Sequence, residues 1–159
     1  MDDLAKGAAG SRQKNLEARV WLRMLTCANL IENELRERLR TGFETTLARF
    51  DVIAQLARPP EEPTMSELSR RLMVTKGSIT DVIGRLEAGG LVERRRDADD
   101  ARVQRVRLTA RGRRLAARTI PAHNERLAEV LRGFGRDDLK ALDELLGRLR
   151  GVLRAASDS

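Results

Sequence analysis

Arginine is the residue type whose amount and placement most clearly indicate chemistry in this sequence. The 159 residues include 31 Lys and Arg against 24 Asp and Glu, which gives a formal net charge of +7 at pH 7. Ten arginines and four acidic residues lie between Leu91 and Arg118. Guanidinium groups bind phosphate oxygens through paired hydrogen bonds, so this cluster predicts a polyanionic partner. The alternative is that it forms a solvated helix face.

The residue types that catalysis or metal binding would need are scarce. The chain has one Cys, Cys27, and one His, His123, so it offers neither an internal disulfide nor a zinc-ligand cluster. It also lacks a phosphate-binding loop and a nucleophile motif. We therefore expect no enzyme activity, no metal and no other cofactor. No apolar run approaches the roughly 18 residues of a membrane helix, and no signal-peptide pattern is present, which predicts a cytoplasmic protein.

Hydrophobic periodicity predicts a mainly α-helical fold with one small β-hairpin. Helices are expected over Asn15–Leu39, from Thr45 to before Pro59, from Thr64 to Leu72, over Lys76–Ala88, from Thr109 to about Leu131, and over Asp137–Arg154. Strands are expected over Leu91–Arg96 and Val103–Leu108, where the period changes to two. Thr41-Gly42 should end the first helix, and Pro121 should kink or split the fifth.

Two short helices near the middle of the chain are typical of a helix-turn-helix. Thr64 and Glu67 fit a capping box, Met73-Val74 fits a brief turn, and Thr75 can cap the second helix. That second helix should bury Ile79, Val82, Ile83 and Leu86 and end at Gly89-Gly90. Because a hairpin follows directly, the pattern predicts a winged helix-turn-helix. The expected organisation is a tail over 1–14, an N-terminal helix over 15–44, the winged helix over 45–110, C-terminal helices over 111–155 and a tail over 156–159.

The segment TMSELSRRLMVTKGSITDVIGRLEAGGLVERRRDADDARVQRVRLTARG is similar to the winged helix of the multiple-antibiotic-resistance regulator (MarR) family. ELSRRLMVTKGSIT, GLVERR, the D-x-R at Asp100–Arg102 and the LT-x-x-G at Leu108–Gly112 carry the resemblance, which covers roughly Leu16 to Leu153. It implies a transcriptional regulator, expected to be a repressor, that binds a pseudo-palindromic double-stranded DNA operator as a homodimer. Dimerisation through the terminal helices suits their surplus of apolar positions.

The helix Lys76–Ala88 should present its polar side to the major groove. Its N-terminal amides favour phosphate, so Thr75 and Lys76 are expected to contact phosphate or a base edge, while Ser78 and Thr80 read base edges. For Thr75, simple N-capping is an equally good interpretation. Asp81 departs from the family pattern. It can accept from cytosine or pair with Arg85 one turn on, and the pairing is slightly favoured.

In the hairpin, the resemblance assigns Arg102 to a minor groove and Asp100 to orienting it. A narrow A·T-rich groove concentrates negative potential, which suits an arginine at a hairpin tip. Arg94, Arg95 and Arg96 are expected to meet phosphates in a salt-dependent and almost sequence-independent way.

Family members commonly respond to small aromatic or other anionic ligands, so the resemblance implies an effector pocket. An aromatic acid or its CoA thioester is a candidate ligand. The candidate walls are Trp21, Met24, Leu25, Ala28, Phe43, Phe50 and Met73. For each of these apolar residues ordinary core packing is the favoured interpretation. Arg23 or Arg36 could pair with the ligand, or both could equally be surface charges.

Cys27 could be a peroxide sensor, as in one branch of the family, but the chain has none of the tyrosines that accompany such a cysteine there. An inert small hydrophobic residue is the favoured interpretation. The alternative function is a basic architectural or RNA-binding protein without an effector. The winged helix and the scarcity of aromatic stacking platforms favour duplex DNA.

Overall fold

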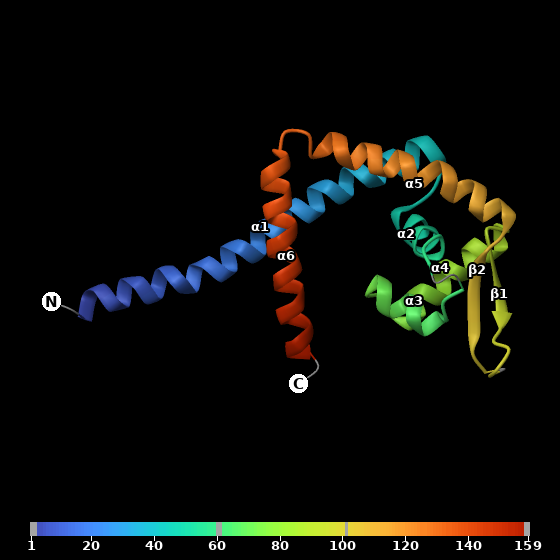
Figure 1. Ribbon diagram of the computed structural model, residues 1–159, viewed down its shortest axis with the longest axis horizontal. Helices are drawn as coiled ribbons and strands as arrows, with labels where there is room; N and C mark the ends of the chain where they lie inside the picture. The colour runs from blue at the N-terminus through green and yellow to red at the C-terminus, as the bar shows by residue number, and fades with distance from the viewer. Residues whose placement is uncertain (1–2, 60–61, 101, 158–159) are drawn as a thin grey trace.

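The computed structural model describes residues 3–59, 62–100 and 102–157, with side chains described from residue 15 to residue 156. The mainly helical fold with one small hairpin is confirmed (Figure 1). In chain order the elements are α1 (Asp3–Phe43), α2 (Leu47–Leu56), α3 (Met65–Leu72), α4 (Lys76–Ala88), β1 (Val92–Arg96), β2 (Gln104–Leu108), α5 (Ala110–Val130) and α6 (Arg136–Ser157).

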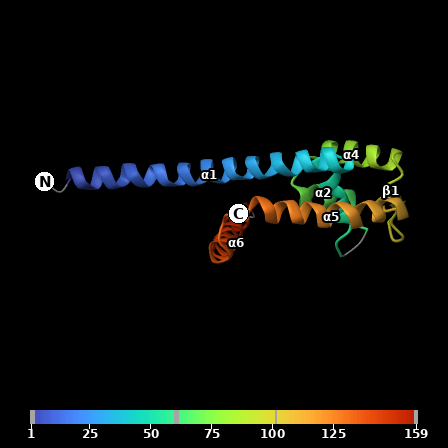
Figure 2. The same cartoon turned by 90° about the horizontal axis from the view of Figure 1, so that it is seen from above.

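The winged helix, α2 to β2, gathers at one end of two long helices. α1 and α5 run side by side above it, and α1 continues well beyond it towards the N-terminus (Figures 1 and 2). α6 turns away from the end of α5 and, seen from above, lies clear of α1 (Figure 2). The terminal helices therefore extend far outside the body of the winged helix.

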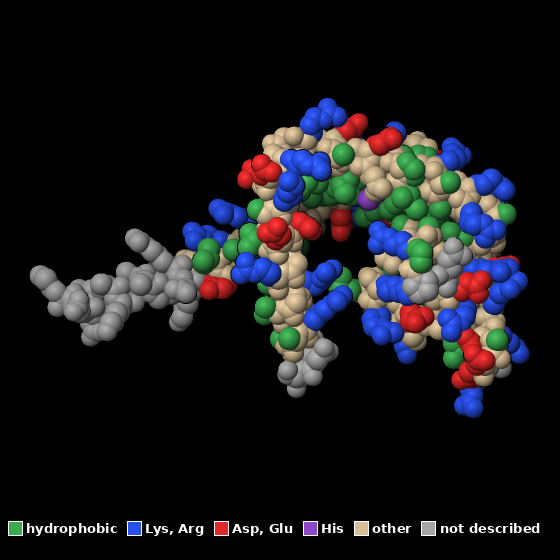
Figure 3. All heavy atoms as spheres, viewed as in Figure 1, with side chains coloured by type: hydrophobic (Ala, Val, Ile, Leu, Met, Phe, Trp, Pro, Cys, Tyr) green, Lys and Arg blue, Asp and Glu red, His purple; other side chains and the backbone are tan. Residues whose placement is uncertain are grey.

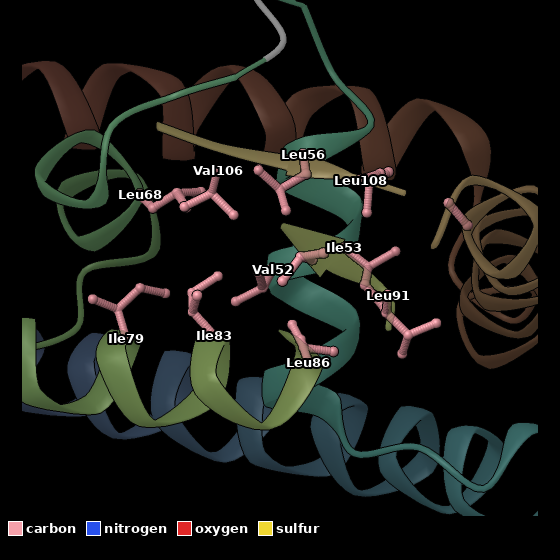
Figure 4. Close-up of a cluster of buried hydrophobic side chains, with 12 residues drawn as sticks. Val52, Ile53, Leu56, Leu68, Ile79, Ile83, Leu86, Leu91, Val106 and Leu108 are labelled. Atoms are coloured by element: carbon pink, nitrogen blue, oxygen red, sulfur yellow. The ribbon is translucent and has the colours of Figure 1, made fainter. Parts of the chain in front are cut away.

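The core joins one apolar face from each element of the winged helix (Figure 4). Fully burying a Leu or Ile side chain stabilises a fold by roughly 1.5–3 kcal/mol, so these side chains hold the five elements together. Of the four inward residues predicted on α4, three are buried and Val82 is half-buried. The cluster contains Val52, Ile53 and Leu56 of α2, Leu68 of α3, Ile79, Ile83 and Leu86 of α4, Leu91, Val92, Val106 and Leu108 around the hairpin, and Ala116 of α5.

Threonine caps position three of the helices as the sequence predicts. The Thr64 hydroxyl accepts from the Glu67 amide at 3.1 Å, and the Glu67 carboxylate accepts from the Thr64 amide at 2.7 Å. This backbone donation holds the pKa of Glu67 below its ordinary value. Thr75 and Thr109 each accept from the amide three residues later at 3.1 Å. Each cap satisfies an amide that the helix leaves without a partner.

The hairpin is antiparallel and pairs Val92 with Leu108 and Arg96 with Gln104. Its strands are each one residue shorter than predicted. The Leu91 amide donates to the Leu86 carbonyl at 2.9 Å and so completes the end of α4 instead of extending β1. The Val103 amide likewise donates within the wing turn, to the Asp100 carbonyl at 2.9 Å.

Several predicted boundaries of the long helices are wrong. α1 begins at Asp3, so the described part of the predicted tail, residues 3–14, is helical. This segment has no proline and many residues of high helix propensity, which need no apolar stripe to continue a helix. α1 also passes through Thr41-Gly42 and ends at Phe43, and the Thr41 hydroxyl donates to the Glu37 carbonyl one turn back at 2.9 Å. The left-handed residue that follows the helix is Glu44 instead, with φ of 51°.

Other boundaries shift by a residue or a few. α2 begins at Leu47, because the Thr46 hydroxyl, not that of Thr45, accepts from the Arg49 amide at 3.3 Å. The sequence predicts that Pro121 kinks or splits the fifth helix. α5 is continuous across Pro121, so the split does not occur. α6 begins at Arg136 and reaches Ser157, into the predicted tail. Residues 60–61, between the second and third predicted helices, and residues 158–159 of the predicted tail lie outside the described residues.

Gly112 should be essential for joining α5 to the winged helix. A Cβ at this position would lie 2.0 Å from the Leu91 carbonyl oxygen and 3.1 Å from the Leu108 side chain. Because the first obstacle is backbone, Gly112→Ala should lower the free energy of unfolding by about 3 kcal/mol or more. The measurement is urea denaturation beside Gly133→Ala, whose Cβ would meet nothing within 4 Å. Equal stability of the two variants would contradict this account.

Candidate nucleic-acid interface

The N-terminal half of α4 presents a polar, exposed side. Thr75, Lys76, Ser78, Thr80 and Asp81 are all exposed, as predicted, because the apolar residues of this helix face the core. The hydroxyls of Thr75 and Ser78 lie 2.9 Å apart, and the Thr75 hydroxyl also caps the helix. The N-capping interpretation of Thr75 is thus confirmed, and its contact with DNA stays a prediction.

Hydrogen bonding within α4 limits what its hydroxyls can offer to a base. The Thr80 hydroxyl donates to the Lys76 carbonyl at 2.7 Å. Its proton is therefore used inside the helix, and its lone pairs face outward as acceptors. Thr80 is better suited to a base amino group than to a base carbonyl.

Asp81 pairs with Arg85, the interpretation that the sequence slightly favours. Arg85 Nη2 lies 3.0 Å from Asp81 Oδ2, and the two side chains are 72% and 60% exposed. An exposed pair of this kind contributes about 0.3–0.5 kcal/mol. A phosphate or base could therefore replace either partner at little cost.

The three arginines of β1 are not equivalent. Arg94 donates to Glu87 of α4 through Nε at 3.0 Å and lies 2.9 Å from it through Nη2, so it fastens the hairpin to α4. Arg95 has a looser contact with Glu93 at 3.5 Å, and Arg96 is exposed. Arg95 and Arg96 are therefore more available to phosphates than Arg94.

The wing turn is organised by Asp97, a residue that the sequence reasoning missed. One carboxylate oxygen accepts from the amides of Asp99 and Asp100 at 2.9 and 3.2 Å, and the other accepts from Arg105 Nε. The Arg105 bond, followed by the two amides, holds the pKa of Asp97 below its ordinary value. The signal available in the sequence is an Asp directly after a strand in D-x-D-D, a pattern typical of an Asx turn.

Arg102 projects from the turn that Asp97 closes. The Asp100 carboxylate accepts from the Arg102 amide at 2.9 Å, while the Arg102 guanidinium Nε is 3.9 Å away. The Arg102 side chain is 96% exposed. Asp100 thus fixes the Arg102 backbone and leaves the guanidinium free to enter a groove.

The base of the hairpin is tied to the segment before α3. Val106 donates to the Pro63 carbonyl at 3.0 Å, and Arg105 Nη1 donates to the Glu62 carbonyl at 3.1 Å. Arg107 pairs with Glu93 across the hairpin and with Glu62 at 3.5 Å. These contacts fix the direction in which the wing points.

The predicted effector residues do not form one pocket within a single chain. Trp21, Leu25 and Ala28 are exposed on α1 and Met24 is half-buried there. The guanidinium carbon of Arg118 lies over the Phe43 ring, 5.9 Å from the ring centroid. Phe50 is buried and stacks on His123, with the two ring centroids 4.4 Å apart. Met73 is 92% exposed in the left-handed turn between α3 and α4.

The polar groups suggested for an effector are spread in the same way. Arg23 is exposed, and Arg36 lies 3.5 Å from Glu32.

Two further polar residues near these elements have no predicted effector role. Asp51, next to Phe50, has a pKa raised by burial, which His123 opposes and Glu32 reinforces. Cys27 is exposed on α1 in the single chain.

A pocket of 430 Å³ is built from other residues, between α2, β2 and α5. Its walls combine apolar side chains with two guanidiniums and one carboxylate. The lining residues are Leu56, Ala57, Glu62, Arg107, Leu108, Arg113, Ala116, Ala117, Ile120 and Pro121. The sequence predicts none of these residues to line a pocket, because the pocket forms where three elements meet. The pattern of each element alone indicates only core or surface positions.

Within the described residues, no group of three His, Cys, Asp or Glu side chains is arranged to hold a metal ion. Nor does any helix of that part of the chain have the length and hydropathy needed to cross a membrane.

Comparisons with known proteins agree on the kind of molecule that carries this arrangement. A profile of the MarR family matches residues 43–103. YkoM of Bacillus subtilis, an HTH-type transcriptional regulator, is 30% identical over 116 residues, which span 72% of this chain and 73% of that protein. PecS of Dickeya dadantii, also an HTH-type transcriptional regulator, is 26% identical over 79% of this chain and 76% of its own length.

Solved structures give the same result. A MarR family transcriptional regulator from Silicibacter pomeroyi is 34% identical, with a TM-score of 0.71 over 91% of this chain and 97% of that one. The MarR family regulator Sco3205 from Streptomyces coelicolor, solved in complex with DNA, is 25% identical, with a TM-score of 0.76 over 84% and 85% of the two chains. These relatives are transcriptional regulators and not enzymes.

Substitution of Asp97 should separate wing order from wing charge. Removing a carboxylate from a DNA-facing turn should tighten binding by electrostatics alone. Asp97→Ala should instead weaken binding to a duplex selected from a random pool by roughly tenfold, because it releases two amides and Arg105. Asp97→Asn, which keeps an amide acceptor, should fall between Asp97→Ala and wild type.

The matched control is Asp99→Ala, which removes the same charge from the same turn while Asp97 keeps its contacts. It should bind as tightly as wild type or more so, in fluorescence anisotropy at fixed salt. If both alanine variants bind more tightly than wild type, Asp97 does not order the wing for DNA.

Proposed function

The chain belongs to the MarR family of DNA-binding transcriptional regulators, and we propose that it is a homodimeric repressor released from its operator by a small aromatic or anionic effector. The observation that carries the DNA-binding part is the pairing of two exposed surfaces on one rigid domain. These are the polar N-terminal half of α4 and the wing tip, where the Arg102 side chain is 96% exposed.

Each surface suits a different groove of the duplex. An α-helix fits the major groove, where Ser78 and Thr80 can meet base edges and the α4 N-terminus can meet a phosphate. Arg102 enters the adjacent minor groove, where a cation is favoured by a narrow A·T-rich sequence. Arg95, Arg96 and Lys76 contribute phosphate contacts that position the domain without reading sequence.

A second copy of this chain is the proposed cover for the terminal helices. Between residues 16 and 30 α1 exposes large apolar side chains, and α6 does the same while projecting away from the rest of the chain (Figure 1). Apolar surfaces of this extent mark an interface, and a two-fold dimer would place two winged helices on one pseudo-palindromic site. The exposed residues include Leu16, Val20, Trp21, Leu25 and Leu30 of α1 and Leu139, Leu142, Leu145, Leu146 and Val152 of α6.

The same dimer supports the proposed effector site. Trp21, Leu25 and Ala28 are open in one protomer, so an apolar ring could lie between them and the partner that covers α1. Arg23 on the same helix can pair with the anionic group of the ligand. Met73 lies in the exposed turn before α4 and is left out of this site.

Two variants should distinguish the two DNA-contacting surfaces. Arg102→Ala removes a cation, so it should weaken binding to most duplexes. It should also reduce the slope of log affinity against log salt concentration by about one, the value for one phosphate contact. Ser78→Ala removes a polar contact without changing charge. It should leave the salt dependence unchanged and reduce discrimination against a mutated operator by roughly 1–3 kcal/mol.

The experiment is a salt titration of both variants on the selected operator and on a scrambled duplex. If Ser78→Ala changes the salt dependence and Arg102→Ala does not, the proposed placement of α4 in the major groove and Arg102 in the minor groove is wrong. If the wild-type protein binds both duplexes equally, it is an architectural protein and not a regulator of a specific site.

The dimer is tested at the apolar face of α6. Leu145→Glu places a charge where a partner should pack, so it should yield monomers in sedimentation at micromolar concentration and weaken operator binding at least tenfold. Lys140→Gln, which makes the same change in net charge on the opposite side of α6, where Lys140 pairs with Asp137, should remain dimeric. A dimeric Leu145→Glu variant with normal operator binding would contradict the proposed interface.

A further inference from the structure

We propose that the outer face of α5 binds the phosphate backbone of a second DNA duplex, so that the protein can bridge two DNA segments. This extends the proposed function, from which it takes only that the winged helix holds the first duplex.

The proposed surface is a straight row of three arginines, Arg111, Arg114 and Arg118. Spacings of three and four residues place them on one side of α5, opposite the buried Ala116. All three are exposed. Figure 3 shows Lys and Arg side chains gathered along the outer edge of this end of the molecule. We call these three residues the α5 row.

The α5 row lacks acidic partners. Within the described part of the chain, none of its three members has a carboxylate within salt-bridge distance, whereas Arg94, Arg95, Arg102, Arg105 and Arg107 of the hairpin all do. Arg111 donates to the Gly89 carbonyl at 3.0 Å, and Arg118 lies over the Phe43 ring. Neither contact neutralises the guanidinium. Among the described arginines of the hairpin, Arg96 alone also lacks a carboxylate within that distance. Most of the uncompensated positive charge of this cluster therefore lies on α5.

The α5 row lies at the wrong end of the domain for the operator. Arg111 contacts the C-terminal end of α4, and the opposite end of that 13-residue helix, roughly 20 Å away, carries Thr75 and Lys76. The wing tip is likewise separated from α5 by the length of the hairpin, whose strands have five residues each, roughly 17 Å. In Figure 1 the hairpin points away from α5. A duplex held by α4 and the wing would have to bend around the whole domain to reach the α5 row.

Duplex DNA is the occupant that the chemistry of this surface favours. Arginine binds phosphate through two parallel hydrogen bonds, and the row spans roughly 10 Å of helix, a length that faces about three phosphates of one strand. Residues 111–118 contain no aromatic side chain, and the Phe43 ring beside the row is occupied by Arg118, so the row offers no free ring on which single-stranded bases could stack. The contacts are to the backbone alone, which predicts binding without sequence preference.

The test is capture of a second duplex. A selected operator duplex is immobilised, saturated with protein, and exposed to a fluorescent duplex of unrelated sequence. Wild-type protein should retain the second duplex. Arg114→Gln combined with Arg118→Gln should reduce its capture at least tenfold, because two phosphate contacts are lost per protomer. Arg111 is left unchanged because it also supports the end of α4.

Three controls make the result decisive. Arg132→Gln combined with Arg136→Gln removes the same charge from the exposed connection between α5 and α6 and should capture the second duplex as wild type does. Binding of each variant to the first duplex alone should stay within twofold of wild type. The thermal unfolding temperature should change only slightly, since Arg114 and Arg118 are exposed and the packing contact that is lost is that of Arg118 with the Phe43 ring.

Three results would overturn the proposal. If wild-type protein binds the first duplex but retains no second one, the bridging proposal is wrong and the proposed function still stands. If it does not bind the first duplex, the proposed function is wrong as well. An equal loss of single-duplex binding in the α5 variant would make the row part of the operator interface. If the α5 row binds labelled polyglutamate under conditions in which it does not bind the second duplex, its occupant is an acidic polypeptide and not DNA.

Discussion

The chain segment that leaves α4 touches the start of α5 so closely that backbone meets backbone. The Thr109 amide donates to the Leu91 carbonyl at 3.0 Å, and the Thr109 hydroxyl donates to the Gly90 carbonyl at 2.7 Å. Gly112 leaves room for this contact, and Arg111 adds a further bond to Gly89. Four elements, α4, β1, β2 and α5, converge on these few residues. Their relative orientation is fixed by carbonyls and amides, which have far less freedom than side chains.

This junction connects the long helices to α4 and the hairpin, the two elements that carry the proposed DNA contacts. α5 continues from the junction into the region where it packs along α1, so a shift of α5 must carry the hairpin and the end of α4 with it. Because packed cores are not continuously deformable, such a shift would take the form of a rigid-body change between two arrangements. An effector held near α1 would act through differential contacts with those two arrangements.

Sequence reasoning succeeded where the determining interactions are local. The capping box at Thr64, the caps at Thr75 and Thr109 and the apolar side of α4 each depend on residues within one helical turn, and all are confirmed. It failed where an unfavourable residue is tolerated by its context. Gly42 does not end α1, whose last residue, Phe43, is covered by Arg118, a residue distant in sequence.

Sites that depend on several elements were harder to predict. The exposed residues of α4 could be named because the opposite face is a clear apolar stripe. The role of Arg94 in fastening the hairpin to α4 could not be predicted, because its partner Glu87 is on another element. The charges of the two residues suggest only a solvated surface. The same holds for the pocket beside α5, whose walls come from three elements and whose concavity depends on small residues such as Ala116 and Ala117.

The segment before α3 has a further consequence for the hairpin. A two-stranded ribbon has two open edges, and open edges invite pairing with the strands of other molecules. Here the free side of β2 is occupied, because Val106 donates to the Pro63 carbonyl and Thr64 forms a bridge with Arg105. The other side, along β1, carries consecutive arginines from Arg94 to Arg96, whose charge repels a like strand. The chain thus exposes a slender ribbon to solvent while protecting it from edge-to-edge aggregation.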